Sequence, residues 1–462
     1  MNKLINNNLA DAPSVDELFQ QCESDQDYYA SHLANVSETN PATATQDIVN
    51  EKGIILVKHG NTINQGLANQ LLNHKLLKPL EEQVELENMV SGETLYETFI
   101  QLSQQYLDLD HIHKKLSFDA LFKDLCINNK LPSILLQKLT VMSDNQPLLF
   151  KKGIFSAWIS TMIAHEMGLP EQQILDSFHA GLLRDLGFLH LSPEILDKKG
   201  QLSPAEWRSV QSHVIVGSMI IKRVDSISPI VAQAILEHHE RTDGAGYPVG
   251  KIGETLSTLG QIVAMADAIQ AQRMRQLEDW GLSLRYIEAF LFINSQTHTH
   301  RVYRAMHNII RQSALPEITF NPFESNTAFR DNVVERNLQL QVAENNVASL
   351  KSRLEATEPS DKSSKGIYVQ IAALELVFQS SGVLGNDITQ WLQQSAPNDA
   401  DISNELTEIY LLQHEICWHL KNLAKNYGNH LEQKESAGKK LPIDMAIMAK
   451  TLHEQAHAIS TH

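Results

Sequence analysis

Apolar residues recur three and four positions apart along almost all of residues 129–324, which is the spacing of a buried helical face. Glycine and proline divide this region into pieces of helical length, because both residues interrupt helices. The breaks lie at Pro170, Gly187, Pro193, Gly244 to Pro248, and Pro316. The pattern predicts an all-helical domain over residues 129–324 and a mainly α fold for the chain.

Two smaller regions precede this domain. Residues 1–50 are rich in Asn, Gln, Ser and Thr, and we expect a polar, partly ordered segment there. Over residues 51–128, the apolar run from Ile54 to Val57 predicts a short strand. The leucines after the turn at Gly60 predict a helix capped near Asn61 to Asn64. The sequence therefore predicts a small α/β domain at 51–128.

Residues 325–462 are helical in pattern as well. Val333, Leu340, Val347 and Leu354 recur every seven residues, which indicates either a short coiled coil over 333–354 or a helix with one buried stripe. A polar linker is expected at 358–366. Three further helical patterns follow, at 367–380, 402–427 and 443–459. Together these segments predict a C-terminal helical bundle.

Composition limits the class of protein. A chain of 462 residues is long enough for several domains. Its net charge of −17 argues against a nucleic-acid polymer as partner, because binding a phosphate backbone calls for clustered Lys and Arg. The three cysteines, Cys22, Cys126 and Cys417, form no CxxC pair, so we expect neither a disulfide framework nor a thiolate zinc site. No segment has the roughly 18 apolar residues of a membrane span, and we expect a cytoplasmic protein.

One helix of the central region has a clear start signal. Ser203 is a suitable N-cap, Pro204 occupies the first helical position, and Glu206 completes a capping box. We expect a helix that begins at Pro204 and carries His213 about three turns later.

Ionisable residues also occur where the pattern predicts burial. Asp267 lies among small and apolar residues, where an ionised carboxylate is costly unless it is paired or binds a metal. His238 and His239 end another helical segment. Histidine and carboxylate together suit iron, manganese or zinc. Taken singly, each residue has an ordinary explanation: His213 as a hydrogen-bonded or exposed histidine, Asp267 as an internal acceptor, and Asp185 as an aspartate near a helix end.

Five pieces of sequence occur in the order found in one known family. They are LLRDLGF, ILDKKGQLSPAEW, SHVIVG, HHERTDGAGYPVGKIGE and IVAMADAIQA. On these motifs, the span from Phe155 to Gln272 resembles the HD-GYP domain, a subgroup of the HD phosphohydrolases whose members hydrolyse cyclic di-GMP. The resemblance implies an all-helical HD fold and a bacterial signalling protein. The GIILVKHG element is similar to a small domain that precedes HD-GYP domains in some proteins.

The resemblance also implies a set of site residues, because active members of the family hold two or three metal ions. Carried over to this chain, the metal ligands are Asp185, His213, His238, His239 and Asp267. The substrate loop is Asp243, Gly244, Gly246, Tyr247 and Pro248. Two ligands are replaced: the HD histidine falls on Arg184, and an upstream histidine falls on or near Phe155.

Arg184 changes the chemistry of the first metal position. A guanidinium stays protonated and offers only hydrogen-bond donors, so it repels a cation instead of binding one. We expect it to pair with Asp185, with Asp267, or with both. The remaining ligands then leave room for one divalent metal (Fe, Mn or Zn), or for none. The family's phosphate-binding lysine and arginine fall on Phe188 and Gln261, and the second aspartate of its last motif falls on Gln270.

Three functions stay open at this point. The one we favour is a degenerate HD-GYP protein, a pseudoenzyme that acts as a regulatory scaffold in cyclic di-GMP signalling and contacts a protein partner through its C-terminal helices. The second is an active metal-dependent cyclic di-GMP phosphodiesterase, with Asp185 as its catalytic residue. The third is a receptor that binds cyclic di-GMP without hydrolysing it. Cations that remain near the motifs for such a ligand are Lys198, Lys199, Arg241 and Lys251.

Overall fold

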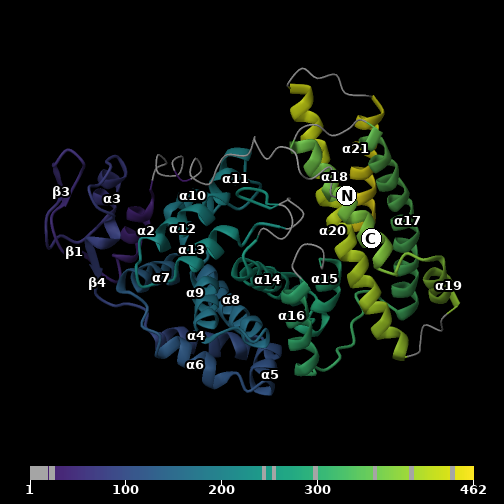
Figure 1. The fold of residues 1–462 in the computed structure, drawn as a ribbon, viewed down its shortest axis with the longest axis horizontal. Coiled ribbons are helices and arrows are strands. Elements are labelled where there is room, and N and C mark those ends of the chain that lie inside the picture. Colours follow the sequence, from purple (N-terminus) through teal and green to yellow (C-terminus); the bar gives the residue numbers. More distant parts are fainter. Residues whose placement is uncertain are drawn as a thin grey trace.

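The computed structural model describes most of the chain in eight stretches. They are Phe19, 27–241, 246–251, 256–294, 300–356, 362–394, 400–436 and 443–461. The described part is elongated: a small unit with strands lies at one end, helices fill the middle, and a bundle of long helices lies at the other end (Figure 1). This is the mainly α fold that the apolar spacing predicted. The residue limits of the individual domains stay predictions.

The N-terminal unit contains short strands of two or three residues each. Two antiparallel pairs form, β1 with β4 and β2 with β3. Asn64 accepts a hydrogen bond from the Leu67 backbone N–H at 3.0 Å and caps the helix α3, as predicted. The elements are α2 (Tyr29–Val36), β1 (Ala42–Ala44), β2 (Ile48–Val49), β3 (Ile55–Val57), α3 (Gln65–Leu72), η1 (Leu80–Glu82) and β4 (Val84–Leu86).

The central region is built from helices alone among its described residues. Its core consists of α8 packed on α9 and α14, and of α12 packed on α13. The elements are α4 (Gly92–Gln105), α5 (Leu107–Lys115), α6 (Asp119–Ile127), α7 (Ser133–Asn145), α8 (Pro147–Glu166), α9 (Glu171–Leu183), η2 (Leu186–His190), α10 (Pro193–Leu196), α11 (Pro204–Gln211), α12 (His213–Lys222), α13 (Pro229–Glu237), α14 (Thr258–Gln272), η3 (Arg273–Leu277), η4 (Leu284–Tyr286), α15 (Ile287–Ile293) and α16 (His300–Ser313).

One helix prediction in this region is wrong at its far end. The capping box forms as expected, with Ser203 and Glu206 bonded to each other's backbone. The helix then ends at Gln211, and Ser212 separates it from α12. His213 is therefore the first residue of a new helix and does not continue the helix that begins at Pro204. The break lets α12 run in a direction of its own, toward α13.

Five helices form the C-terminal part: α17 (Asn326–Ala356), α18 (Lys362–Ser380), α19 (Asn386–Gln394), α20 (Ala400–Ser436) and α21 (Ile443–Thr461). The heptad residues Val333, Leu340, Val347 and Leu354 are all buried, and α17 packs against the four other helices. These residues thus form one buried stripe inside the chain's own bundle. The expected linker at 358–366 is shorter than predicted, because α18 already begins at Lys362; residues 357–361 lie outside the described part.

Across the stretches that the structure describes, no helix combines the length and the apolar character that a membrane crossing requires.

Candidate functional site

Arg184 lies at the centre of the candidate site. It follows the last residue of α9, and its side chain is 1% exposed. Its Nη2 lies 2.9 Å from Oδ1 of Asp267 on α14 and 3.1 Å from Oδ2 of Asp185. Its Nε donates to the same Asp267 oxygen at 3.1 Å. The guanidinium therefore lies between two carboxylates that belong to different elements. Of the three expected pairings (Asp185, Asp267 or both), the structure shows the one with both.

The other hydrogens of this guanidinium also have acceptors. Nη1 donates to the carbonyl oxygens of Lys152 and Gly181, at 3.3 and 3.2 Å. Nη2 donates to Oε1 of Gln270 at 3.3 Å. Since all three nitrogens are hydrogen-bonded, the buried charge is compensated and the side chain is held in one position.

The charge of Arg184 favours the ionised form of Asp267. Burial of this carboxyl, whose side chain is 23% exposed, opposes ionisation, but the adjacent guanidinium, together with His239, His238 and Lys152, lowers the pKa of Asp267 to about 2. Asp267 is therefore an anion at neutral pH, and Arg184 neutralises it. A metal ion would play the same electrostatic part at this position in a site built from histidine and aspartate.

Three histidines form the second half of the site. His213 begins α12, His238 caps α13, and His239 follows it. One ring nitrogen from each lies within 4.8 Å of the others, and the distance between Nε2 of His213 and Nε2 of His238 is 3.4 Å. The geometry brings together the three histidines that the sequence predicted.

Hydrogen bonds set the tautomers of two of these rings. Nδ1 of His213 lies 2.6 Å from the Val210 carbonyl oxygen, and Nδ1 of His238 lies 2.7 Å from the Ile235 carbonyl oxygen. A carbonyl only accepts, so both Nδ1 atoms carry the proton and both Nε2 atoms keep a free electron pair. Histidine ligands of metals are commonly held by this kind of outer hydrogen bond.

The histidines and the carboxylates face each other across the site. Oδ1 of Asp185 lies 3.8 and 4.0 Å from Nε2 of His213 and of His238, and Nδ1 of His239 lies 3.8 Å from Oδ2 of Asp267. Burial lowers the pKa of His213 and brings the pKa of His238 to about 3. Both rings are neutral near pH 7. Converging neutral imidazoles beside a carboxylate fit a divalent cation, so the residues of this half suit a metal ion.

Gly187 allows the two halves to approach. A Cβ built at Gly187 would lie 2.0 Å from the carbonyl oxygen of His213 and 2.9 Å from the backbone nitrogen of Gly217, so no side chain fits there. As a result η2 packs directly on the first turn of α12. The same contact places the Phe188 ring on the His213 ring, with centroids 4.1 Å apart. At the position where the resemblance implies a phosphate-binding lysine, this chain therefore has an aromatic ring that covers a histidine.

The structure describes part of the predicted substrate loop. Asp243 and Gly244 lie outside the described residues, whereas Gly246, Tyr247 and Pro248 lie within them. A Cβ at Gly246 would lie 2.4 Å from the Arg241 backbone nitrogen, so the backbone at Gly246 packs directly against that of residues 239–241. The Tyr247 ring then stacks on His239, with centroids 4.7 Å apart.

Two buried glutamates that the sequence analysis did not single out hold this loop. Glu240 accepts from the backbone N–H groups of Val249 and Lys251, at 2.6 and 2.8 Å. Glu237 accepts from the backbone and hydroxyl of Ser257 and pairs with the Lys251 ammonium. The signal was present in the run EHHE, where a glutamate flanks the paired histidines on either side.

The replaced and neighbouring positions also have partners. Phe155 is fully buried in α8, Gln261 donates to the Leu256 carbonyl at 3.1 Å, and Gln270 accepts from Arg184. Lys198 pairs with Glu206 at 2.7 Å, and Lys251 pairs with Glu237. These two lysines, expected as cations for a phosphate ligand, are therefore engaged with carboxylates of the chain itself.

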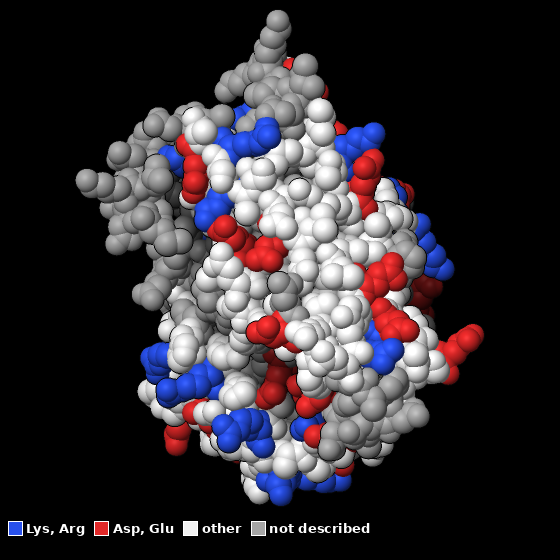
Figure 2. Space-filling view, turned by 90° about the vertical axis from the view of Figure 1, so that its right-hand side faces the viewer, with Lys and Arg blue, Asp and Glu red and all other residues white. Residues whose placement is uncertain are grey.

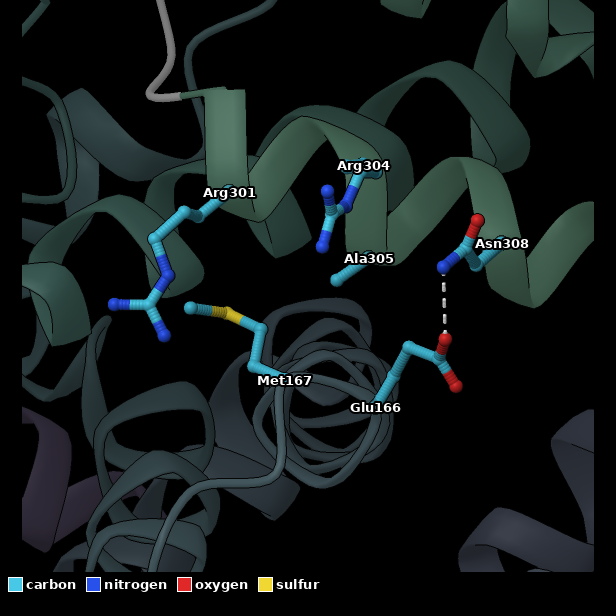
Figure 3. Close-up of a pocket in the computed structure, with 6 residues that line it drawn as sticks. All are labelled: Glu166, Met167, Arg301, Arg304, Ala305 and Asn308. Atoms are coloured by element: carbon cyan, nitrogen blue, oxygen red, sulfur yellow. Dashed lines mark hydrogen bonds between the residues drawn. The ribbon is translucent and has the colours of Figure 1, made fainter.

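A separate small pocket of about 100 Å³ lies between the end of α8 and α16 (Figure 3). Arg301 and Arg304 line it together with Glu166, which accepts hydrogen bonds from Asn308 at 3.0 Å and from Gln312 at 3.2 Å. It shares no lining residue with the histidine cluster. The pocket therefore does not belong to the candidate site.

Comparisons with known proteins agree with the motifs. The family model described as HD domain matches residues 136–302. A cyclic di-GMP phosphodiesterase of Thermotoga maritima is 38% identical over 120 residues, which is 26% of this chain and 33% of the relative. A 3'3'-cGAMP-specific phosphodiesterase 3 of Vibrio cholerae is 30% identical over 197 residues, which is 43% of this chain and 40% of the relative. The matches thus span about a third to two fifths of these relatives.

Solved structures give a weaker likeness. An HDGYP protein from Bdellovibrio bacteriovorus matches with a TM-score of 0.32 and 14% identity, over 62% of this chain and 96% of that one. A cyclic GMP-AMP specific phosphodiesterase of Vibrio cholerae matches with a TM-score of 0.30 and 14% identity, over 68% and 97%.

Proposed function

We propose that this chain, whose residues 136–302 match the family model described as HD domain, is a signalling protein of the HD-GYP kind that has lost efficient phosphodiester hydrolysis. The observation that carries the proposal is the position of Arg184 between Asp185 and Asp267. A buried organic cation, hydrogen-bonded through all its nitrogens, takes the place that the family gives to a first metal ion.

The loss follows from what a guanidinium lacks. Two adjacent metal ions assist phosphodiester hydrolysis by generating hydroxide from a bound water and by neutralising charge on both the attacking and the leaving oxygen. Arg184 supplies positive charge, but it offers no vacant coordination position and cannot lower the pKa of a bound water as a metal does. Its hydrogens are moreover already used by Asp185, Asp267, Gln270 and two carbonyls.

The histidine half is the part that would hold an ion. His213, His238, His239 and Asp185 would bind one divalent metal, and such an ion would supply Lewis acidity when bound. The chain's own residues prepare the position: Val210 and Ile235 fix the tautomers, and Phe188 and Tyr247 cover two of the rings. In this proposal the ion stabilises the fold around the loop and does not turn over substrate.

A regulatory scaffold in cyclic di-GMP signalling fits the site better than a receptor does. The relatives act on cyclic dinucleotides by name, which makes this ligand class the one to test. The carboxylates that engage Lys198 and Lys251, together with the aromatic ring of Phe188, weaken the case for tight phosphate binding. The long C-terminal helices would then contact a protein partner.

An assay alongside an active relative tests the proposal. The protein, supplied with Mn²⁺ or Fe²⁺, is incubated with cyclic di-GMP or 3'3'-cGAMP, and we expect turnover below roughly 1% of that of the Thermotoga relative, as loss of a several-kcal/mol metal contribution implies. Chelator-sensitive turnover at a rate similar to the relative's would contradict it. Calorimetric titration separates the other functions, because binding without turnover indicates a receptor and no binding indicates a scaffold.

A further inference from the structure

Lys138 on α7 is a buried lysine whose ammonium group contacts three other elements. Charged side chains normally lie at the surface, as on the face of the molecule in Figure 2, where Lys, Arg, Asp and Glu are visible among uncharged residues. The Lys138 side chain is instead 0% exposed. A buried ammonium is costly unless its hydrogens have partners, so the groups around Lys138 are expected to be held firmly in place.

The ammonium has one partner for each of its three hydrogens. Nζ lies 3.1 Å from Oε1 of Glu81 in η1, 3.0 Å from Nε2 of His190 in η2, and 3.8 Å from the centre of the Tyr29 ring in α2. Glu81 and Tyr29 belong to the small N-terminal unit, whereas His190 ends the short helix that follows Asp185. Lys138 therefore joins the N-terminal unit to η2.

The ring of His190 is bonded on both sides. An ammonium only donates, so Nε2 of His190 accepts from Lys138, and the ring is the neutral tautomer with its proton on Nδ1. Nδ1 donates to Oδ1 of Asp27 at 2.8 Å. The Tyr29 ring stacks on the His190 ring, with centroids 5.3 Å apart. His190 thus bridges a carboxylate that precedes α2 and the buried ammonium of α7.

The backbone at the end of η2 is held by the same unit. The Tyr28 backbone N–H donates to the His190 carbonyl oxygen at 3.3 Å. Nε2 of His32 on α2 donates to the Leu191 carbonyl oxygen at 3.0 Å. The N-terminal unit therefore fixes this end of η2 through its backbone as well as through a side chain.

The other end of η2 contacts the histidine cluster. Phe188, two residues before His190, stacks on the His213 ring with centroids 4.1 Å apart. Gly187 packs so closely on the His213 carbonyl oxygen that a Cβ would lie 2.0 Å from it. Because η2 is a tightly wound helix of five residues, a shift of His190 cannot be absorbed before it reaches Phe188. Such a shift would displace the His213 ring.

We propose that Lys138 and His190 are positioning residues of the candidate metal site, and that the small N-terminal unit holds His213 in place through them. The proposal rests on the proposed function in one respect, since it treats His213 as a metal ligand. Lys138 and His190 act through η2 and do not bind the ion. Loss of a group that supports a ligand commonly weakens metal binding about 10- to 100-fold.

Two substitutions at one position separate the bonds of His190 from its bulk. His190→Leu removes both bonds of the ring. His190→Gln keeps an amide donor for Asp27 and a carbonyl acceptor for Lys138, so it is the conservative variant that should rescue the site. Asp27→Ala is a milder change at a side chain that is 60% exposed, and it removes one of the two bonds. Circular dichroism checks that each full-length variant is folded.

His113→Leu on α5 is the matched control. The His113 ring is also buried and also bonded on both sides, to Asp119 at 3.2 Å and to Nε1 of Trp158 at 3.2 Å. Neither contact involves η2 or α12. A general loss of stability would therefore affect this variant as well, whereas a loss of positioning would not.

Titration with Zn²⁺ against a chromogenic chelator measures the affinity of the site for the ion. We expect His190→Leu to weaken Zn²⁺ binding about 10-fold or more. Asp27→Ala should weaken it about threefold, as loss of one hydrogen bond implies, and His190→Gln should stay within about threefold of the wild type. His113→Leu should leave the affinity unchanged.

Hydrogen exchange of the metal-free protein measures the same coupling without an ion. Peptides that cover residues 186–191 and 213–217 should exchange faster in His190→Leu than in the wild type, because the segment that holds them is released. The same peptides should be unchanged in His113→Leu.

Unchanged exchange of these peptides in His190→Leu would overturn the proposal. Unchanged Zn²⁺ affinity in His190→Leu would overturn it as well, and so would a His190→Gln or His113→Leu variant that behaves like His190→Leu. A wild type that binds no Zn²⁺ would contradict the metal position in the proposed function, and the exchange measurement alone would then decide whether η2 is positioned as described.

Discussion

The two halves of the candidate site differ in whether the protein itself supplies the positive charge that each half can hold. In one half, Arg184 joins Asp185 and Asp267, and every nitrogen of the guanidinium has an acceptor. In the other, the Nε2 atoms of His213 and His238 lie 3.4 Å apart. Both Nε2 atoms are unprotonated, so no hydrogen bond joins them. The first half is complete within the protein, and the second half suits an added cation. If Arg184 occupies a former metal position, as we propose, the replacement leaves neither buried carboxylate unpaired.

Restoring both lost histidines should change the site most. We expect Arg184→His together with Phe155→His to bind one more metal ion than the wild type and to raise cyclic dinucleotide hydrolysis at least about 100-fold, since a second metal restores the clamp on both reacting oxygens. Metal analysis and a product assay measure the two effects. Phe155→His alone is the control, because it leaves the guanidinium in place. Unchanged metal content in the double variant would contradict the proposal that Arg184 occupies the first metal position.

Removing the cation should cost the most stability. Arg184→Ala leaves Asp267 and Asp185 without their buried partner, and we expect a loss of about 3 to 5 kcal/mol in the free energy of unfolding, measured in urea. Arg273→Ala is the matched control, since it breaks a buried pair outside the site in which Nε and Nη2 bind Asp108 at 2.7 and 2.9 Å. Both variants should be destabilised, but only Arg184→Ala should bind a cation more tightly. A loss below about 1 kcal/mol would mean that the pair is not compensating buried charge.

A buried carboxyl elsewhere shows what Asp267 would resemble without a guanidinium. Glu415 in α20 receives a hydrogen bond from the Asn294 amide at 2.9 Å, and burial raises its pKa to about 7. The folded protein therefore keeps this proton between about pH 4.5 and 7, where the unfolded chain has released it. Glu415 makes folding progressively less favourable as pH rises through this range, by roughly 3 kcal/mol in total.

Glu415→Gln should remove that dependence, because glutamine keeps the shape and does not ionise. Thermal or urea unfolding of both proteins at several pH values measures it. The stability of wild type relative to the variant should fall as pH rises from 4.5 to 7. A difference that does not vary with pH would mean that the carboxyl ionises normally.

The smallest expected effect concerns the ligand. Phe188→Lys restores a cation beside His213, and we expect cyclic di-GMP to bind about 5 to 10 times more tightly, as one added charged hydrogen bond to a phosphate implies. Phe188→Leu controls for loss of the aromatic ring. If lysine and leucine act alike in calorimetry, position 188 does not face the ligand.

Patterns local in sequence predicted most of the fold. Helical spacing, the cap at Asn64 and the Ser203 capping box all concern neighbours within a few residues, and each appears in the structure. The break at Ser212 was missed because it depends on where α12 must point to pack on α13, and no residue there forbids a helix. The heptad positions of α17 were found, but which partner buries them depends on helices far along the chain.

Most residues of the candidate site were predicted from the sequence as well. The resemblance to HD-GYP domains implied the histidines and aspartates, and elementary charge arguments gave the pairing of Arg184. Backbone acceptors such as the carbonyls of Lys152 and Val210 were not predictable, because a carbonyl carries no sequence signal. The anchoring roles of Glu237 and Glu240 depend on where the loop returns, which the sequence does not specify.

The metal content of the wild-type chain tests the central claim most directly. Protein is saturated in turn with Fe²⁺, Mn²⁺ and Zn²⁺, freed of unbound metal by gel filtration, and analysed by mass spectrometry for ions per chain. With Arg184 in the first position, we expect no more than one ion per chain, and His213→Ala should abolish its retention. Two ions per chain in the wild type would contradict the account.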